Sequence, residues 1–398
     1  MMTIFLLAIN LLDLEKLALA QNAAYQQAEI QVRIAEGQRK QAGLYPNPSI
    51  GFNSEHNSPN PAVRWGSNGG VIGQRIVTGG KLGVEKALAD REIDEARARR
   101  DLARLELSGH LRRLYYQALG EQQLLTVREQ LSKTAAETAG VFRQLLNTGL
   151  ADEPDVLSAD VEAQRAAVRL TQARQALERT RLQLSAVVQQ EVGPGPLEGD
   201  FLALPALERA VVWSLIETEN PEFSLPGISI RRADLQLAQA RKARIPDIQA
   251  RGGVRYNREL SEISRAAIGP EGIFDISVEL PLFNRQQGAI AAAKAMQARA
   301  ALEPVRVRRS LDSRFAGVWQ AYEQARTAAE RYRQEMLPAT EKALKLYRAN
   351  YKAMSGTYPN VLQTQRTYFQ LQEEYLEALQ SAWDAVADLE ARLVSYNP

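Results

Sequence analysis

The chain has 398 residues, of which 45% are hydrophobic and 24% are charged, and its formal net charge is +2. This is the composition of an ordinary folding chain, and so small a net charge gives no overall field that would select nucleic acid or an acidic surface. The chain contains no cysteine, which excludes disulfides, thiolate metal sites and a cysteine nucleophile within it.

The first predicted helix covers residues 14–42 and ends at the motif GLYPNP, where a glycine and two prolines prevent its continuation. The apolar start, MMTIFLLAINLL, resembles a short signal core, and residues 18–20 resemble a small-residue cleavage site. However, no lysine or arginine precedes this core, and charged residues separate it from the cleavage motif. We therefore favour a start that runs directly into the first helix.

Four short strands are predicted, near residues 49–55, 70–77, 247–256 and 273–283. In the last of these, Ile276, Val278 and Leu280 alternate with polar residues, which is the period of a strand with one apolar face. No apolar run reaches the roughly 18 residues that a spanning helix needs, so any membrane insertion must use strands.

Two very long helices follow the strand pairs. Nothing decisively interrupts the helical pattern of residues 81–147, which predicts a helix about 100 Å long. The equivalent stretch, residues 288–353, is of similar length, although Pro304 and Pro338 are expected to kink or interrupt it. After each tip turn a return helix runs antiparallel. The first carries apolar residues spaced as in a coiled-coil seam, at Leu170, Ala173, Leu177, Leu184 and Val187.

The two halves repeat one order of elements: helix, strand, strand, long helix, turn and long helix. Asn22 aligns with Asn220, IVTGGKLGVEKA aligns with PLFNRQQGAIAA, and PDVL aligns with PNVL at the tips. Duplication is the natural explanation, and chance similarity between alanine-rich helices is the alternative. We predict a first repeat at residues 1–192, with strands near 49–77 and a tip turn near 147–156. A linker at 193–204 precedes a second repeat at 205–398, with strands near 247–283 and a tip turn near 354–361.

The strands and the long helices together indicate a tube that several copies of the chain build. Four strands are too few to close a membrane barrel, and an open sheet edge in lipid costs several kcal/mol for each unpaired backbone group. Several chains must therefore share one barrel. Helices of this length must also pack on each other and on neighbouring subunits. The predicted fold is mainly α with a small membrane β part, assembled as a trimeric α/β barrel tube. The alternatives are a soluble coiled-coil scaffold and a periplasmic adaptor, although an adaptor carries only one hairpin.

The doubled pattern resembles the TolC-type outer membrane efflux factors over essentially the whole chain. The more specific motifs are QAGLYPNPSI, TGGK, VELPLFNRQQG and NTGLADEPDVLSA. The resemblance implies a homotrimeric channel, surrounded by outer membrane lipid, that completes a tripartite efflux pump with a periplasmic adaptor and an inner membrane transporter of the resistance-nodulation-division type. It implies an outer membrane location in a Gram-negative-type cell, with a periplasmic extension. PLFNRQQG is most similar to the heavy-metal branch, which would make metal cations the cargo; a drug-exporting branch is the alternative.

The resemblance places the functional residues at the two tip turns, which form the periplasmic mouth. The adaptor-contact candidates are Asn147, Thr148, Gly149, Leu150, Gly356 and Thr357. The gate or selectivity candidates are Asp152, Glu153, Asp155, Tyr358 and Asn360. Repeated around a symmetry axis, the carboxylates would attract cations; the alternative is that they stabilise a helix dipole. Tyr358 either plugs the mouth or packs at its turn. Asn360 stands where many relatives have aspartate, which weakens the case for an acidic ring from the second repeat.

Enzyme motifs are not found in the sequence. It contains no glycine-rich phosphate loop, catalytic triad or clustered catalytic carboxylates, so we predict that the protein is not an enzyme and has no cofactor. His56 and His110 are far apart and lack a ligand-spaced partner, so no metal site is predicted. Nucleic acid binding would need a basic surface interleaved with aromatic residues, which is also missing.

Overall fold

The computed structural model describes residues 10–55, 66–149, 151–260, 266–352 and 358–394. The chain divides into two compact units. We call them the helical unit (Met1–Ala28, Arg99–Phe223 and Arg308–Pro398) and the sheet unit (Glu29–Ala98 and Ser224–Val307). Within the described ranges, no helix is both long and apolar enough to cross a membrane.

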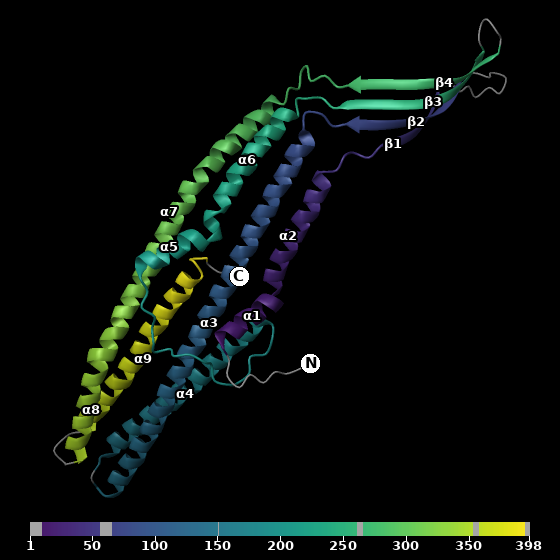
Figure 1. Ribbon diagram of the computed structural model, residues 1–398. Coiled ribbons are helices and arrows are strands. Elements are labelled where there is room, and N and C mark those ends of the chain that lie inside the picture. The colour runs from purple at the N-terminus through teal and green to yellow at the C-terminus, as the bar shows by residue number, and fades with distance from the viewer. Residues whose placement is uncertain (1–9, 56–65, 150, 261–265, 353–357, 395–398) are drawn as a thin grey trace. The chain divides into compact units, whose positions relative to one another are not determined.

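Helices make up most of the chain, which confirms the predicted mainly α fold (Figure 1). In chain order they are α1 (Leu11–Gln21), α2 (Ala23–Ala42), α3 (Lys81–Asn147), α4 (Glu153–Val188), α5 (Arg209–Glu219), α6 (Leu225–Lys242), α7 (Gln287–Arg331), α8 (Leu337–Lys352) and α9 (Tyr358–Glu390). A 3-10 turn (Pro221–Phe223) lies between α5 and α6, and a π-helical turn (Tyr332–Met336) lies between α7 and α8. The bounds of α3 agree with the prediction.

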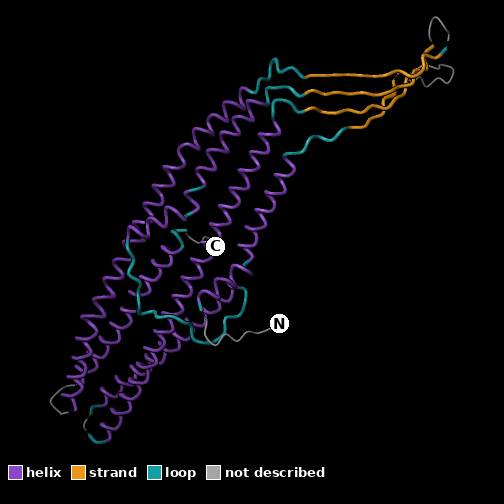
Figure 2. Tube along the Cα trace, viewed as in Figure 1, coloured by secondary structure: helices purple, strands orange, loops and turns teal. Residues whose placement is uncertain are grey.

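The strand pairs of the two repeats join into a single antiparallel sheet in the sheet unit. Its strands β1 (Ser49–Glu55), β2 (Ser67–Ile76), β3 (Ile248–Leu260) and β4 (Ala267–Val278) lie side by side in chain order (Figure 2). β2 pairs with β3 from Ser67 opposite Asn257 to Ile76 opposite Ile248. The hairpin of the first repeat (β1 and β2) therefore pairs with the hairpin of the second (β3 and β4) through β2 and β3.

The fourth strand differs from its prediction. The alternating pattern predicts residues 273–283, whereas β4 begins at Ala267 and ends at Val278. Val278 is opposite Ile248, the first residue of β3, so no strand partner is left for the residues beyond it. Pro281 also lacks a backbone donor. The alternation of apolar and polar residues therefore continues to Leu280, although strand pairing ends at Val278.

The first predicted helix is broken into α1 and α2 at Asn22. The ψ angle of Asn22 is 121°, which is an extended conformation. Its side-chain oxygen accepts hydrogen bonds from the backbone N–H groups of Ala24 (3.0 Å) and Tyr25 (3.2 Å) and thereby caps α2. Its amide nitrogen donates to the carbonyl of Val187 near the end of α4 (3.1 Å). The prediction of one continuous helix was wrong because periodicity does not register this cap.

Asn220 performs the same task in the second repeat. It follows α5 with a ψ of 116°, and its side-chain oxygen accepts from the N–H of Glu222 (2.8 Å). Its amide nitrogen donates to the carbonyl of Arg392, just after α9 (2.8 Å), and its side chain is buried. The two aligned asparagines therefore each tie a helix break to the end of the return helix of their own repeat.

The two prolines of the second long helix behave differently. α7 continues through Pro304, so of the two expected effects, a kink or an interruption, the interruption does not occur there. Proline costs about 3 kcal/mol inside a helix, and lateral packing along a long helix offsets such a local loss. Near Pro338 the interruption is present: the N–H of Leu337 donates to the carbonyl of Tyr332, the wider spacing of a π-helical turn.

The linker between the repeats belongs to the core of the helical unit. Leu197 and Phe201 are 4% and 1% exposed, although the linker is rich in proline and glycine. Trp383 of α9 donates its indole N–H to the carbonyl of Phe201 (2.8 Å), and the hydroxyl of Tyr322 of α7 donates to the carbonyl of Pro205 (2.5 Å). Aromatic donors from the helices thus satisfy the irregular backbone of the linker and of Pro205, which directly follows it.

One carboxylate holds the sheet to the start of α3. Asp247 directly precedes β3, and its side chain is only 8% exposed. It accepts hydrogen bonds from Arg75 at the end of β2 (2.6 Å), from Lys81 at the start of α3 (2.8 Å) and from the backbone N–H of Thr78 (3.1 Å). Burial opposes ionisation, but these donors outweigh it and lower the pKa of Asp247 to about 2.

We predict that Asp247→Asn lowers the stability of the purified protein at pH 7 by about 2 kcal/mol, because it removes charge-assisted hydrogen bonds. The ordinary pKa of the group is 3.8, so its contribution is complete above that pH and is lost as the pH falls through about 2. Thermal unfolding between neutral and acidic pH measures both effects. Asp234→Asn is the control, since Asp234 is exposed and accepts from Gln297 (2.7 Å). Equal losses in the two variants would contradict the prediction.

Candidate functional site

The two faces of the sheet differ in chemistry. The cross-strand register places the even-numbered residues of the strands on one face. That face carries large apolar side chains that are each more than half exposed: Ile50, Phe52, Ile72, Val254, Tyr256, Phe274 and Ile276. A contiguous exposed apolar surface marks contact with something other than water.

The opposite face of the sheet is polar. Its odd-numbered positions include Glu55, Arg75, Gln249, Arg251, Arg255, Asn257, Glu271 and Asp275. Alternation between an apolar outer side and a polar inner side is the pattern of transmembrane barrel strands around an aqueous lumen. The sheet therefore has the chemistry of a piece of barrel wall.

Two edges of this wall segment lack a partner strand. Among the described strands, β1 pairs only with β2, and β4 pairs only with β3. Unpaired backbone groups in lipid cost several kcal/mol each, and so few strands cannot close on themselves. Pairing of β4 of one copy with β1 of the next would satisfy both edges and would close into a ring.

The first tip turn joins α3 to α4 and is exposed. Asn147 is the last residue of α3, and the hydroxyl of Thr148 donates to the carbonyl of Leu145 (3.0 Å). Gly149 follows with a φ of +73°, in the left-handed region that favours glycine. The structure therefore brings Asn147, Thr148 and Gly149 together at one tight turn. Leu150, the remaining candidate in this turn, lies outside the described residues.

The carboxylates of the first tip lie at the start of α4. Asp152 is the N-cap residue but makes no side-chain capping bond, and Glu153 and Asp155 lie in the first turn. Asp152 and Glu153 are exposed, whereas Asp155 is half-buried. Burial, and then the charge of Asp155, raise the pKa of Tyr351 in α8. This placement suits a role in stabilising the helix dipole, and the exposure of Asp152 and Glu153 also suits contact with cations.

The second tip turn leads into α9, and most of its candidates lie outside the described residues. This is so for Gly356, Thr357 and the side chain of Tyr358, whose backbone begins α9. Asn360 is exposed in the first turn of α9, at the position that aligns with Asp155. The first turn of α9 contains no acidic residue, so the beginnings of the two return helices differ in charge.

An apolar cluster beneath the tips joins the two helical hairpins. Its buried members come from α3, α4, α8 and α9, namely Ala139, Phe142, Val156, Ala159, Leu344 and Val361. The ring of Phe142 stacks on that of Tyr351, with centroids 6.4 Å apart and planes inclined by 20°. Because four helices share one close-packed cluster, displacement of one tip would disturb the packing of the other.

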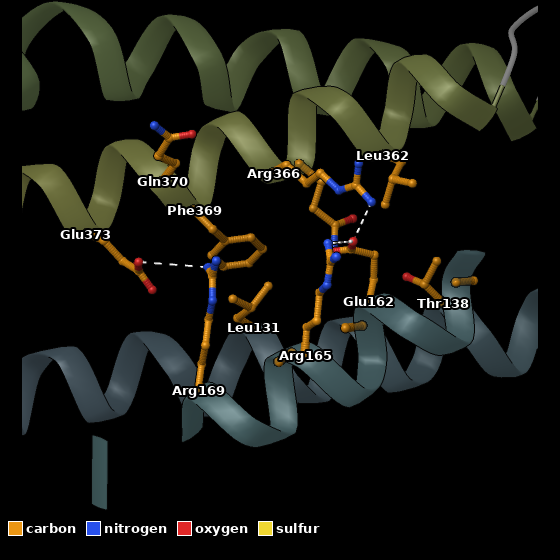
Figure 3. A pocket seen from close by; sticks show the side chains of 14 residues that line it. Leu131, Thr138, Glu162, Arg165, Arg169, Leu362, Arg366, Phe369, Gln370 and Glu373 are labelled. Carbon is orange, nitrogen blue, oxygen red and sulfur yellow. Dashed lines mark hydrogen bonds and ion pairs between the residues drawn. The ribbon is translucent and has the colours of Figure 1, made fainter. Parts of the chain in front are cut away.

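A cleft of roughly 320 Å³ is lined by residues of α3, α4 and α9 (Figure 3). Glu162 of α4 accepts a hydrogen bond from Arg366 of α9, and Arg169 of α4 points toward Glu373 of α9 at 4.0 Å. Arg128 of α3 donates to the same Glu373 (3.2 Å). Sequence analysis missed these residues, since helical periodicity marks them as polar positions but does not reveal which hairpin they face.

Histidines and clustered carboxylates form no metal centre in the described ranges, where no three histidine, cysteine, aspartate or glutamate residues are placed to hold an ion. His110 is half-buried in α3, and burial, followed by the charge of Arg113, lowers its pKa. His56 lies outside the described residues.

Known proteins match this chain over both halves of its sequence. The model of the outer membrane efflux protein family matches residues 14–188 and 213–393, which covers both repeats. The cobalt-zinc-cadmium resistance protein CzcC of Cupriavidus metallidurans is 24% identical over 362 residues, which span 89% of this chain and 82% of CzcC.

Solved structures share the fold at low sequence identity. A membrane protein from Pseudomonas aeruginosa superposes with a TM-score of 0.81 and 16% identity, covering 96% of this chain and 93% of that chain. The open state of the Neisseria gonorrhoeae MtrE outer membrane channel superposes with a TM-score of 0.78 and 20% identity, covering 97% of this chain and 89% of that chain.

We predict that Gly149→Val destabilises the helical unit by about 1–2 kcal/mol, because valine at a positive φ is strained. Apart from Gly149 and its two chain neighbours, no heavy atom lies within 4 Å of a Cβ added at Gly149, so the loss would come from the backbone and not from a clash. Gly149→Asn is the matched control, since asparagine tolerates the left-handed region. Thermal unfolding checks the pair, and equal effects of the two substitutions would contradict the explanation.

Proposed function

The chain belongs to the outer membrane efflux protein family, and from this premise we propose that it is the exit duct of a metal-cation efflux pump. The observation that carries the proposal is the sheet with one apolar face, one polar face and two unpaired edges. A soluble coiled-coil scaffold would leave the apolar face in water. A periplasmic adaptor would not require the duplicated hairpin.

In this proposal a homotrimer shares one barrel in the outer membrane. β4 of each copy pairs with β1 of its neighbour, so that every edge backbone group has a partner in lipid. The apolar face carrying Phe52 and Phe274 contacts lipid, and the polar face carrying Arg251 and Arg255 lines the lumen. The long helices continue the passage on the periplasmic side.

The tips of the helical hairpins are the proposed contact with the rest of the pump. A periplasmic adaptor would dock on the turn formed by Asn147, Thr148 and Gly149, and would connect the duct to an inner membrane transporter of the resistance-nodulation-division type. The exposure of this turn supports the proposal. The second tip turn, with Gly356 and Thr357, would take the equivalent place in the second repeat.

Divalent metal cations are the proposed cargo. The similarity to a cobalt-zinc-cadmium resistance protein extends over 89% of the chain, which supports a cation over an organic substrate. Asp152 and Glu153 are exposed at the first tip, where carboxylates would raise the local concentration of cations. Asp155 lies deeper and, together with Tyr358 and Asn360, would border the narrowest part of the mouth.

The quaternary state and permeability of the purified protein test the duct. Expressed behind a competent signal sequence, the protein should fractionate with the outer membrane and require detergent. Light scattering should give a protein mass near three times 44.2 kDa. Liposomes containing it should admit Zn²⁺ to an enclosed fluorescent indicator, whereas liposomes without it should not. A detergent-free monomer or dimer would overturn the proposal.

The absence of native cysteine allows a sharp test of adaptor docking. Thr148→Cys, labelled with a short photo-crosslinker, should form a covalent adduct with a co-expressed periplasmic adaptor of a cation pump. Thr218→Cys, at an exposed site on α5, is the matched control and should form none. Adducts of equal yield at the two sites, or adducts at Thr218 alone, would contradict docking at the tip.

A further inference from the structure

Arg255 connects three strands across the polar face of the sheet. Its Nε donates to Glu271 of β4 (2.8 Å), and its Nη1 donates to Glu55 of β1 (3.2 Å). Asn257 of β3 also donates to Glu271 (3.4 Å). The two glutamates come from opposite edges of the sheet, and one guanidinium holds both carboxylates.

Gly69 makes this arrangement possible. Arg255 lies on β3 and Glu55 on β1, so the arginine side chain must cross β2, where Gly69 stands opposite Arg255. A Cβ at Gly69 would lie 2.6 Å from the Cβ of Arg255 and 2.4 Å from the carbonyl oxygen of Val254. Any side chain at this position would therefore obstruct the path of Arg255 along the wall.

Two carboxylates directed at one point would bind divalent cations and slow their passage through a cation duct. Carboxylate oxygens are the ligands that hard divalent cations prefer, and zinc also accepts them. Conduction requires that a permeating ion bind weakly enough to leave. Without Arg255, Glu55 and Glu271 would face the lumen as a two-carboxylate site, repeated in each subunit of the ring.

We propose that Arg255 is a resident counter-cation that occupies the Glu55–Glu271 pair and so prevents the barrel from retaining its divalent cargo. Arg255 is then a selectivity-determining residue of the barrel, separate from the mouth at the helical tips. This inference rests on the proposed function, because it requires that the polar face line a lumen through which divalent cations pass.

Arg251 provides a matched comparison within the same strand. It lies four positions before Arg255 on the same face, and its register neighbours are Gly73 on β2 and Asp275 on β4. One carboxylate therefore stands opposite Arg251, whereas two converge on Arg255. Loss of either arginine removes one positive charge per subunit, but only loss of Arg255 exposes a pair of carboxylates.

Planar bilayer recordings of the full-length trimer test the proposal, with Zn²⁺ added to one chamber. At about 1 mM Zn²⁺, a concentration at or above the dissociation constants of weak oxygen-ligand cation sites, we expect Arg255→Gln channels to lose at least about half of their conductance. Wild-type and Arg251→Gln channels should change little. The double variant Arg255→Gln/Glu271→Gln retains one carboxylate of the pair and should recover the wild-type response.

The outcomes distinguish failure of the proposal for Arg255 from failure of the proposed duct function. A wild-type protein that forms no channel overturns both. Wild-type channels together with zinc-insensitive Arg255→Gln channels overturn the inference alone, and so does equal zinc block of Arg251→Gln and Arg255→Gln. If Arg255→Gln does not assemble, Arg255→Lys takes its place. A lysine ammonium lacks the fork geometry to hold both carboxylates, so partial zinc block is expected, and complete insensitivity overturns the proposal.

Discussion

The need to pair every backbone group in lipid is the constraint on which the rest of this structure depends. The sheet offers an apolar face to its surroundings, yet its outer strands β1 and β4 each have one partner in the chain. A barrel wall with open edges is unstable in a membrane. In the proposed duct, the duplicated hairpin is therefore one part of a ring of copies. In the described chain, β2 and β3 already form the same kind of junction between the repeats that β4 and β1 would form between subunits.

Within each unit, long elements are held at a few points by side chains that bind backbone or charge. Asn22 and Asn220 each end one helix and bind a carbonyl near the end of the return helix of the same repeat. Asp247 ties the end of β2, the start of α3 and the start of β3 together through one carboxylate. Such ties suit a duct, because the positions of very long helices must be set along their length.

In the proposed duct, function divides between two chemically different places. The tips combine an exposed turn and exposed carboxylates with a cluster of apolar residues that four helices share. Docking of a partner at one hairpin would therefore disturb the packing of the other. The polar face of the sheet is instead a wall whose charges are partly neutralised by its own arginines. In the proposed duct, attraction of cations at the mouth and their release at the exit require these opposite properties.

Periodicity and breakers in the sequence were enough to determine the class of the fold and the bounds of α3 and β1, and they predicted the duplication. These features depend on local propensity and on repeated spacing, which one chain records by itself. The break at Asn22 and the end of β4 at Val278 involve partners distant in sequence. The uninterrupted passage through Pro304 and the π-helical turn before Pro338 were likewise seen only in the structure. Only the tertiary structure brought Arg255 to Glu55 and Glu271, and Arg366 to Glu162, because charge pairing across strands and hairpins is decided by register and packing and leaves no period in the sequence.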